Sequence, residues 1–412
     1  MRRTLSVDRP PEFATIRAIM DKLKIALTHT RYSYTGGIEK YIHSLVERLL
    51  AAGHEVHYIA AKWEPREHPR LIFHRVPIVR FPPSLRVLSF NDGANRILDE
   101  HDFDIVHGFT KTDRQDVYTD GSGCLEEYLD ATLADRPRWW RRLYRATPHQ
   151  RAIEKMERRR FQRNAIRHIV PMARFVRDQI LLHYPVEPER VEVVYNGVEL
   201  EHFNPRNRET LGVEYRRAQK IDPDTPLLLF VGNDWKRKGL VTVLEALPKI
   251  AEAIGRPPLL LVAGHDNHPD RFESTAARLG VTEMVRWLGP VREIREPFAA
   301  ADLFVFPTRY DVFGNVGLEA LASGVPSLLS RRAGVSEVIE GHEGAAGKIL
   351  HDPYSSEELA AGAIELLQGD SAETRAAARS VAEEYSWDRH FDRILEIYDQ
   401  VLAEKRAEKE HA

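Results

Sequence analysis

Two acidic residues frame a glycine-containing loop in the second half of the chain. The stretch TRYDVFGNVGLEALASG spans residues 308–324 and places Asp311 eight positions before Glu319. A carboxylate at the start of such a loop can accept hydrogen bonds from sugar hydroxyls, and one in the following helix can hold a ribose. Gly314 removes side-chain crowding from the loop, and Asn315 or a neighbour opens the helix. The alternative is a helix-capping acid followed by an unrelated surface glutamate.

A basic cluster lies at another expected junction between a strand and a helix. In VGNDWKRKG, residues 231–239, the cations Lys236, Arg237 and Lys238 are consecutive. Cations beside a helix N-terminus are electrostatically unfavourable unless an anion binds there, and a phosphate would account for them. The alternative is an exposed basic loop.

Two glycines follow the first expected strand. Gly36 and Gly37 would let a ligand approach the free N–H groups at a helix start. The alternative is a tight turn that requires positive φ. The sequence is not the GxGxxG of dinucleotide-binding proteins, which argues against an oxidoreductase.

Polar residues also follow the expected strand at residues 104–109. His107 and Lys111 lie at its carboxyl end, and Asp116 and Asp120 come next. Either acid could serve as a base on the acceptor side of a reaction, or neither. For His107 the alternative is a buried histidine with satisfied hydrogen bonds. The nearby DFD at 102–104 only leads into this strand, so no metal site is predicted there.

Apolar periodicity predicts alternating strands and helices that would position these groups. Helices are expected at 36–54, 239–255 and 268–279 and before Ala301. Expected strands lie at 24–29, 55–61, 104–109, 168–173, 191–198, 226–232, 257–264, 285–289, 303–307 and 325–330. This alternation predicts an α/β fold with two doubly wound, Rossmann-like domains that face each other across a cleft. Ligands would bind at the carboxyl ends of the strands.

The chain length and composition fit a two-domain globular protein. With 412 residues, the chain is too long for one ordinary core. We expect a disordered extension at 1–21, an acceptor-binding domain at 22–200, a nucleotide-sugar-binding domain at 201–385 and a C-terminal helix at 386–412. The net charge of -3 argues against nucleic-acid binding. No signal-peptide core or membrane-spanning run is visible, so a cytoplasmic protein is expected.

The segment 136–168 is strongly basic. It holds twelve Lys or Arg residues, opposed only by Glu154 and Glu157, and it begins with the paired tryptophans of PRWWRRLY. Indoles combined with cations suit the interface of a membrane that carries anionic lipids. We therefore predict contact with an anionic membrane surface. The alternatives are a solvated basic helix and an electropositive rim for a phosphorylated acceptor.

Taken together, these pieces resemble the glycosyltransferases of family 4, the retaining "group 1" class with the GT-B fold. The resemblance covers about residues 22–400 and rests on ordered elements. These are Gly36-Gly37, the YNGV segment with Asn196-Gly197, VGxxxxxKG with Lys238, WLGPV at 287–291, AADLFVFP at 300–307, DxFGxxxxE, and SW…F…Y at 386–398. The last element is similar to a helix that crosses back to the first domain.

This resemblance implies roles for matching positions. Lys238 would hold the donor diphosphate together with Arg237, because Asn233 stands where the family has its usual arginine. Glu319 would bind the ribose, and Asp311 the transferred sugar. The other donor-side positions are Gly36, Gly37, His107, Val291, Gly314, Asn315 and Val316. No metal and no cofactor are implied, because the nucleotide-sugar is a co-substrate and the leaving diphosphate would help deprotonate the acceptor.

A narrower resemblance is to the branch that glucosylates the heptose of the lipopolysaccharide core. It rests on GFxK at 108–111, DVY at 116–118, Cys124 and the basic segment, whereas that branch has Glu where Asp311 stands and lacks His107. It implies transfer of a hexose from UDP-glucose or a similar donor to a lipid-linked or polysaccharide acceptor at the inner face of the plasma membrane. The alternatives are a GT-B nucleotide-sugar epimerase and a non-catalytic GT-B protein.

Overall fold

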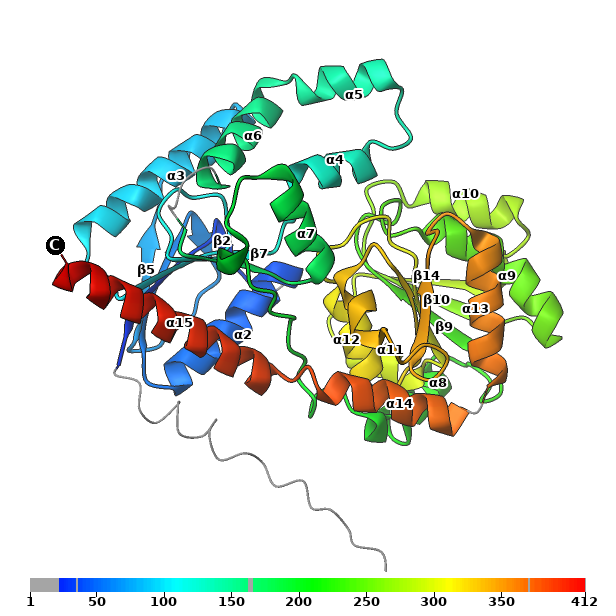
Figure 1. Cartoon of the computed structure of the whole chain (residues 1–412). Coiled ribbons are helices and arrows are strands. Elements are labelled where there is room, and N and C mark those ends of the chain that lie inside the picture. The colour runs from blue at the N-terminus through cyan, green and yellow to red at the C-terminus, as the bar shows by residue number, and fades with distance from the viewer. Residues whose placement is uncertain (1–21, 35, 162–165, 370, 412) are drawn as a thin grey trace, which may run out of the picture.

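Two six-stranded sheets organise the computed structural model, which describes residues 22–34, 36–161, 166–369 and 371–411 (Figure 1). The expected extension at 1–21 lies outside the described residues. The first sheet has the order β5-β3-β1-β6-β7-β8. Its strands are β1 (Lys24–Thr28), β3 (Glu55–Ala60), β5 (Leu71–Arg75), β6 (Ile105–Gly108), β7 (Val117–Asp120) and β8 (His168–Pro171).

The second sheet repeats this topology with the order β11-β10-β9-β12-β13-β14. All neighbouring strands in both sheets are parallel, so the doubly wound prediction is confirmed. Its strands are β9 (Leu227–Val231), β10 (Leu259–Ala263), β11 (Val285–Gly289), β12 (Leu303–Phe306), β13 (Ser327–Ser330) and β14 (Gly347–Leu350). A small third sheet pairs β2 (Arg31–Tyr32) with β4 (Lys62–Trp63).

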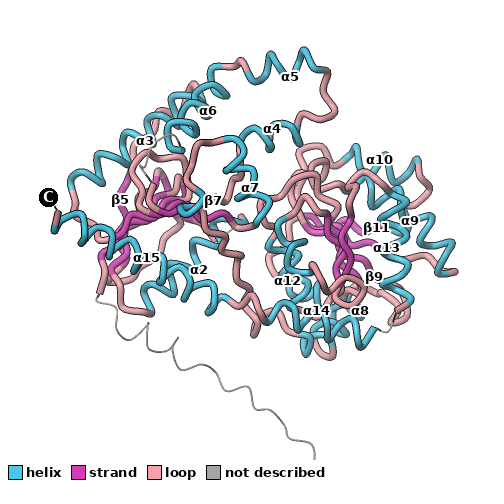
Figure 2. Tube along the Cα trace, in the orientation of Figure 1, coloured by secondary structure: helices cyan, strands magenta, loops and turns pink. Residues whose placement is uncertain are grey.

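Helices lie on both sides of each large sheet (Figure 2). The strands β9 (LLLFV) and β10 (LLLVA) are almost continuously apolar, as expected for strands that are covered on both faces. The helices are α2 (Gly37–Ala51), α3 (Pro83–Glu100), α4 (Leu125–Thr132), α5 (Arg138–Arg145), α6 (Pro148–Phe161), α7 (Arg174–His183), α8 (Leu211–Ala218), α9 (Leu240–Ile254), α10 (Asp270–Arg278), α11 (Arg295–Ala300), α12 (Asn315–Ala322), α13 (Ser356–Gln368), α14 (Ser371–Glu383) and α15 (Trp387–Glu410). The 3₁₀ turns are η1 (Pro188–Arg190), η2 (Pro205–Arg208), η3 (Thr282–Met284) and η4 (Gly334–Ile339).

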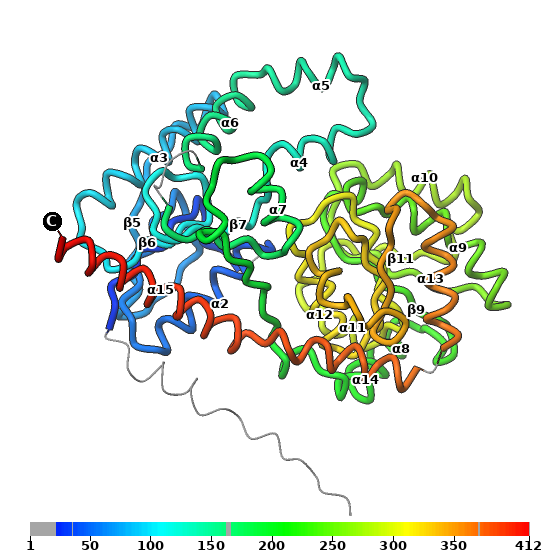
Figure 3. The backbone as a smooth tube through the Cα atoms, in the orientation of Figure 1, coloured from blue at the N-terminus to red at the C-terminus, as the bar shows by residue number. Residues whose placement is uncertain are grey.

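The last helix, α15, returns from the second sheet to the first (Figure 3). Its residues Trp387, Phe391 and Tyr398 are buried in the same apolar cluster as β1 and α2. The Tyr41 hydroxyl of α2 is 2.9 Å from Nε2 of His390 in α15. The C-terminal helix is therefore part of the core of the N-terminal domain.

The prediction of a strand at 191–198 is wrong. Only isolated bridges form there, from Val191 to Ile169 and from Val198 to Ser386. A Cβ atom at Gly197 would lie 2.5 Å from the Cα atom of Trp387, so this segment passes directly against the start of α15. Two backbone hydrogen bonds, from Glu192 to Ile169 at 2.9 Å and from Val194 to Pro171 at 3.1 Å, hold the start of the segment beside β8 without forming a regular strand.

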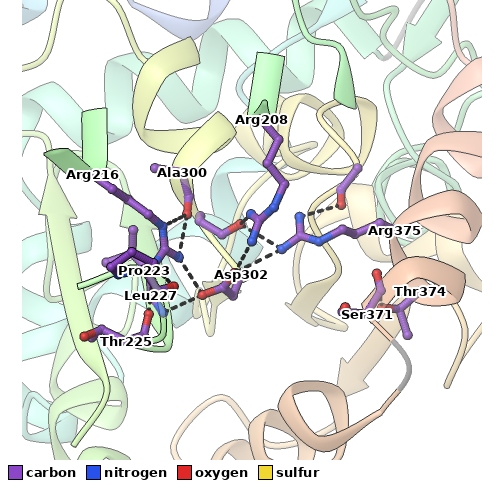
Figure 4. Close-up of polar contacts among 12 residues, drawn as sticks. Arg208, Arg216, Pro223, Thr225, Leu227, Ala300, Asp302, Ser371, Thr374 and Arg375 are labelled. Carbon is purple, nitrogen blue, oxygen red and sulfur yellow. Dashed lines mark hydrogen bonds and ion pairs between the residues drawn. The ribbon is translucent and has the colours of Figure 1, made fainter. Parts of the chain in front are cut away.

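Asp302 ties the connection between the domains to the second sheet (Figure 4). It immediately precedes β12 and accepts hydrogen bonds from Arg208 at 2.7 Å, Arg216 at 2.7 Å and Arg375 at 3.1 Å. Burial alone would raise the pKa of the Asp302 carboxyl, but Arg216 and Arg208 outweigh it and lower the pKa. Because η2, α8 and α14 each supply one arginine, this carboxylate joins both chain segments that link the domains.

Replacing Asp302 with alanine should destabilise the protein strongly, because three guanidinium groups would lose their shared carboxylate. We expect the free energy of unfolding to fall by about 3 kcal/mol in urea titrations. The matched control is Asp224→Ala, because Asp224 lies in the same connection with an exposed side chain. That change should cost less than about 0.5 kcal/mol. Equal losses in the two variants would contradict the assigned role of Asp302.

Candidate functional site

The predicted basic cluster lies in the loop that joins the central strand β9 to α9. This is the point where the strand order of the second sheet reverses, which is the usual ligand position in such sheets. Gly239 has φ 79°, and a Cβ atom there would lie 2.1 Å from the Pro307 carbonyl oxygen, so only glycine fits. This close approach holds the basic loop against the end of β12.

Lys238 and Asp311 form a direct ion pair between these two strand ends. The Lys238 side chain is only 10% exposed, and its ammonium lies 4.6 Å from the centre of the Phe306 ring. Burial lowers the pKa of Lys238, although Asp311 opposes this shift. The buried cation is therefore balanced by one carboxylate, and a diphosphate could compete for it.

Arg237 bridges the basic loop and the loop at 307–314 that carries Asp311, which we call the acid loop. Its Nε donates to Asp234 at 2.9 Å, and its Nη1 donates to the Tyr310 carbonyl at 2.7 Å. Its own carbonyl accepts the Arg309 N–H at 2.8 Å. The structure thus brings Arg237, Lys238 and Asp311 together from two loops that are about 70 residues apart in the sequence.

The N-terminus of α12 begins at Gly314, which has φ 88°. A Cβ atom at this glycine would lie 2.8 Å from the Phe306 ring, so the loop needs its small size. The first residues of α12 are Asn315 and Val316, whose N–H groups lie in the unpaired first turn of the helix. The Asn315 side chain accepts a hydrogen bond from Asn196 of the N-terminal domain at 2.6 Å.

Glu319 lies one turn further along α12. Burial raises the pKa of its carboxyl, and Lys40 in the first turn of α2 opposes the shift. Among the described residues, no hydrogen bond or ion pair reaches this carboxylate. The exposed glycines Gly36 and Gly37 begin the same helix as Lys40, so the glycine loop and α12 face the same space between the domains.

Val291 follows β11 at the same carboxyl edge of the second sheet. It is partly exposed and lies two residues beyond Gly289, whose carbonyl accepts the Gly264 N–H at 2.8 Å. Since β11 is two strands away from β9, Val291 lies at the side of the basic loop. Its assignment to the donor side stays a prediction.

His107 does not lie with the other donor-side candidates. Its ring is fully buried, with Nδ1 2.7 Å from the Tyr398 hydroxyl and Nε2 2.7 Å from the Thr119 hydroxyl. Burial, with a contribution from His390, lowers the pKa of His107 to about 3, so the ring is neutral. This environment favours the alternative of a buried histidine with satisfied hydrogen bonds.

Lys111 and Asp120 are engaged in hydrogen bonds within the N-terminal domain. The Lys111 ammonium pairs with the buried carboxylate of Glu157 in α6. Asp120 accepts from the Tyr118 hydroxyl at 3.0 Å and from the Gly123 N–H at 2.9 Å, which shapes the turn after β7. Both residues lie at carboxyl ends of strands, but each already has a structural partner.

Asp116 was predicted to lie on the acceptor side of the site, and this prediction is wrong. Asp116 precedes β7 and therefore lies at the amino edge of the sheet, away from the cleft side. Its carboxylate accepts from the Val106 N–H at 2.8 Å and from Lys405 of α15 at 2.6 Å. Asp116 thus anchors the C-terminal helix.

No sequence pattern indicated several contacts that cross between the domains. Asp135 pairs with Lys236 at 3.0 Å and with Arg309 at 2.8 Å, so it touches both donor-side loops. The Glu337 carboxylate accepts the backbone N–H groups of Arg174 and Phe175 at 2.8 and 2.9 Å, which caps α7. A single Asp or Glu is unremarkable in sequence, and only the fold brings these pairs together.

The basic segment forms α5 and α6 on the outer side of the N-terminal domain (Figure 1). Trp139 and Leu143, four residues apart on α5, are 67% and 64% exposed. Arg138 and Arg142 have the same spacing and are also exposed. No helix within the described residues is long and apolar enough to cross a bilayer. The described residues also contain no cluster of three or more His, Cys, Asp or Glu side chains that could hold a metal ion.

The carboxylate of Glu319 should reduce the stability of the ligand-free protein. Its raised pKa means that the folded state favours the protonated form, so its contribution becomes unfavourable as pH rises above the ordinary value of 4.5. Glu319→Gln should therefore raise the melting temperature at pH 8, with a gain that shrinks toward pH 4.5. A thermal scan at several pH values measures this, and a pH-independent difference would contradict it.

Comparison with known proteins agrees with this arrangement. The family model of the group 1 glycosyl transferases matches residues 213–385, and the Glycosyltransferase Family 4 model matches residues 35–113. The lipopolysaccharide glucosyltransferase WaaG of Escherichia coli K12 is 28% identical over 339 residues, which cover 81% of this chain and 87% of that protein. The α-maltose-1-phosphate synthase of Mycolicibacterium smegmatis is 30% identical over 255 residues, covering 57% and 63%.

Solved structures show the same architecture. The crystal structure of WaaG aligns with a TM-score of 0.78 and 26% identity over 91% of this chain and 99% of that one. The Anabaena protein HepE in complex with UDP and glucose has a TM-score of 0.69 at 16% identity, covering 92% and 100%, which is a likeness of fold. Since the two family models together span more than half of the 412 residues, the chain belongs to the group 1 glycosyltransferases and has the GT-B fold that its motifs predicted.

Proposed function

We propose that this glycosyltransferase moves a hexose from a nucleotide-sugar, with UDP-glucose as the first candidate, to a lipid-linked or cell-surface glycan. The observation that carries the proposal is the group formed by Lys238, Arg237 and Asp311 at the ends of β9 and β12. Two cations and one acid at this point suit a diphosphate that is joined to a sugar. WaaG, which is similar over most of its length, is described as a lipopolysaccharide glucosyltransferase.

The chemistry assigned to these residues is electrostatic. Lys238 and Arg237 stabilise the charge that builds on the diphosphate as the glycosidic bond breaks. When the diphosphate replaces Asp311 as the ion-pair partner of Lys238, the Asp311 carboxylate becomes free to accept a hydrogen bond from a sugar hydroxyl. Glu319 is placed to accept the ribose hydroxyls, which would give its half-buried carboxylate hydrogen-bond donors.

The stereochemical course that we propose is retention. No protein nucleophile is assigned, so the acceptor would attack on the same face from which the diphosphate leaves. The leaving diphosphate itself would take the acceptor proton. No metal and no cofactor take part in this proposal, because the two cations neutralise the diphosphate.

The proposed acceptor lies at a membrane surface. The exposed face of α5 combines Trp139 and Leu143 with Arg138 and Arg142, which suits the headgroup region of an anionic bilayer. A peripheral position at the inner face of the plasma membrane would bring the cleft close to lipid-linked acceptors. The surface would be used from the cytoplasmic side.

A donor screen followed by site variants tests the function. Thermal shift with UDP-, ADP- and GDP-sugars should single out one nucleotide. Lys238→Ala, Asp311→Ala and Glu319→Ala should each lower transfer to the acceptor by at least about 100-fold. Product anomers identified by NMR should keep the donor configuration. An epimer formed from UDP-glucose alone would support the epimerase alternative, and unchanged turnover in all three variants would contradict the assigned site.

Flotation with liposomes tests the proposed membrane surface. Vesicles that contain anionic lipid should bind the wild-type protein at low salt and release it at high salt, because the attraction is partly electrostatic. The double variant Trp139→Ser/Leu143→Ser should lose most of this binding. The matched control is Leu182→Ser on α7, which removes a 75% exposed apolar side chain outside the basic segment. Equal binding by all three proteins would contradict the proposed surface.

A further inference from the structure

Tyr310 belongs to the acid loop, and its side chain packs against the N-terminal domain. It directly precedes Asp311, yet its side chain is only 4% exposed. The hydroxyl donates to Oε1 of Gln179 in α7 at 3.1 Å, and the ring meets Phe175 of the same helix edge to face at 6.0 Å. Tyr128 of α4 lies on another side at 6.3 Å. A donor-side loop is therefore held by side chains of the opposite domain.

The N-terminal domain leaves space for this side chain. A Cβ atom at Gly123 would lie 2.1 Å from the Tyr310 hydroxyl oxygen, so only glycine leaves the slot open. Gln179 and Phe175 are four residues apart and share one face of α7. The first turn of α7 is in turn capped by Glu337 of the C-terminal domain. The slot thus forms where the two domains are in contact.

The main chain of Tyr310 points back into the donor site. Its carbonyl accepts Nη1 of Arg237 at 2.7 Å and the Thr308 hydroxyl at 3.2 Å. Tyr310 therefore contacts the N-terminal domain through its side chain and hydrogen-bonds to Arg237 of the basic loop through its backbone carbonyl. Withdrawal of the ring from its slot would shift the carbonyl that orients Arg237.

We propose that Tyr310 is a positioning residue that makes the orientation of Arg237 depend on contact between the two domains. This inference rests on the proposed function, because it assigns Arg237 to the donor diphosphate. Closed domains keep the Tyr310 ring in the slot and its carbonyl on Arg237. Open domains release both, so the site binds the diphosphate tightly only when the N-terminal domain is in place.

The test compares two variants that each remove one hydrogen bond between the domains. Tyr310→Phe removes the bond to Gln179, whereas Tyr195→Phe removes the 2.8 Å bond from Tyr195 to Glu337 and leaves the basic loop untouched. We expect Tyr310→Phe to raise the KM for UDP-glucose and the Kd for UDP in calorimetry by about fivefold. Tyr195→Phe should leave both unchanged, although the two variants lose similar thermal stability.

Two further variants test the coupling itself. Gln179→Leu should reproduce the effect of Tyr310→Phe, and the double variant should show no additional loss, because both changes break the same bond. In an Arg237→Ala background, Tyr310→Phe should no longer change the Kd for UDP. Additive effects in either cycle, or equal increases in KM for Tyr310→Phe and Tyr195→Phe, would overturn the positioning role.

The wild-type protein separates this inference from the function on which it rests. If the wild type binds UDP and transfers glucose while Tyr310→Phe behaves like the wild type, only the role of Tyr310 fails. If the wild type binds none of UDP-, ADP- and GDP-glucose, the proposed function fails, and the inference fails with it.

Discussion

The burial of one lysine cation beside one carboxylate sets the geometry of the donor side. Lys238 comes from the end of β9 and Asp311 from the end of β12, so their ion pair joins the two central strands where the sheet order reverses. Desolvation of the ammonium is costly and must be offset by a nearby negative charge. The two loops therefore stay close together, and Gly239 and Gly314 are required where their backbones approach β12 and its Phe306 ring.

The N-terminal domain supplies few charged groups to that centre but controls how it is held. Asp135 contacts cations from both donor-side loops, and Asn196 reaches the first residue of α12. Lys236 is next to the predicted donor ligand Arg237, and Asn315 is itself one of the predicted donor-side residues. The interface between the domains is thus continuous with the candidate site.

Sequence patterns predicted the second domain better than the first for physical reasons. Strands such as β9 and β12 are buried on both faces and form uninterrupted apolar runs, which are easy to recognise. The edge strand β5 (LIFHR) and the terminal strand β14 (GKIL) are only half-buried and were missed, as was β7 (VYTD). Motif order singled out Lys238 and Asp311, and the structure pairs them directly. Asp116 was misplaced because β7 was not predicted, so Asp116 was assigned to the loop after β6 and not to the start of a strand. Partnerships such as Asp135 with Arg309 involve residues far apart in sequence, so no local pattern could indicate them.

The return of α15 also has a consequence for biosynthesis. His107 of the first sheet shares a hydrogen bond with Tyr398, and Asp116 accepts one from Lys405, and both partners lie in α15. A ribosome makes the N-terminal domain first, but that domain lacks part of its core until α15 has emerged. The C-terminal domain, whose sheet is continuous in sequence, can therefore complete its own core before the N-terminal domain does. The order of folding would then be the reverse of the usual order, in which the domain synthesised first also folds first.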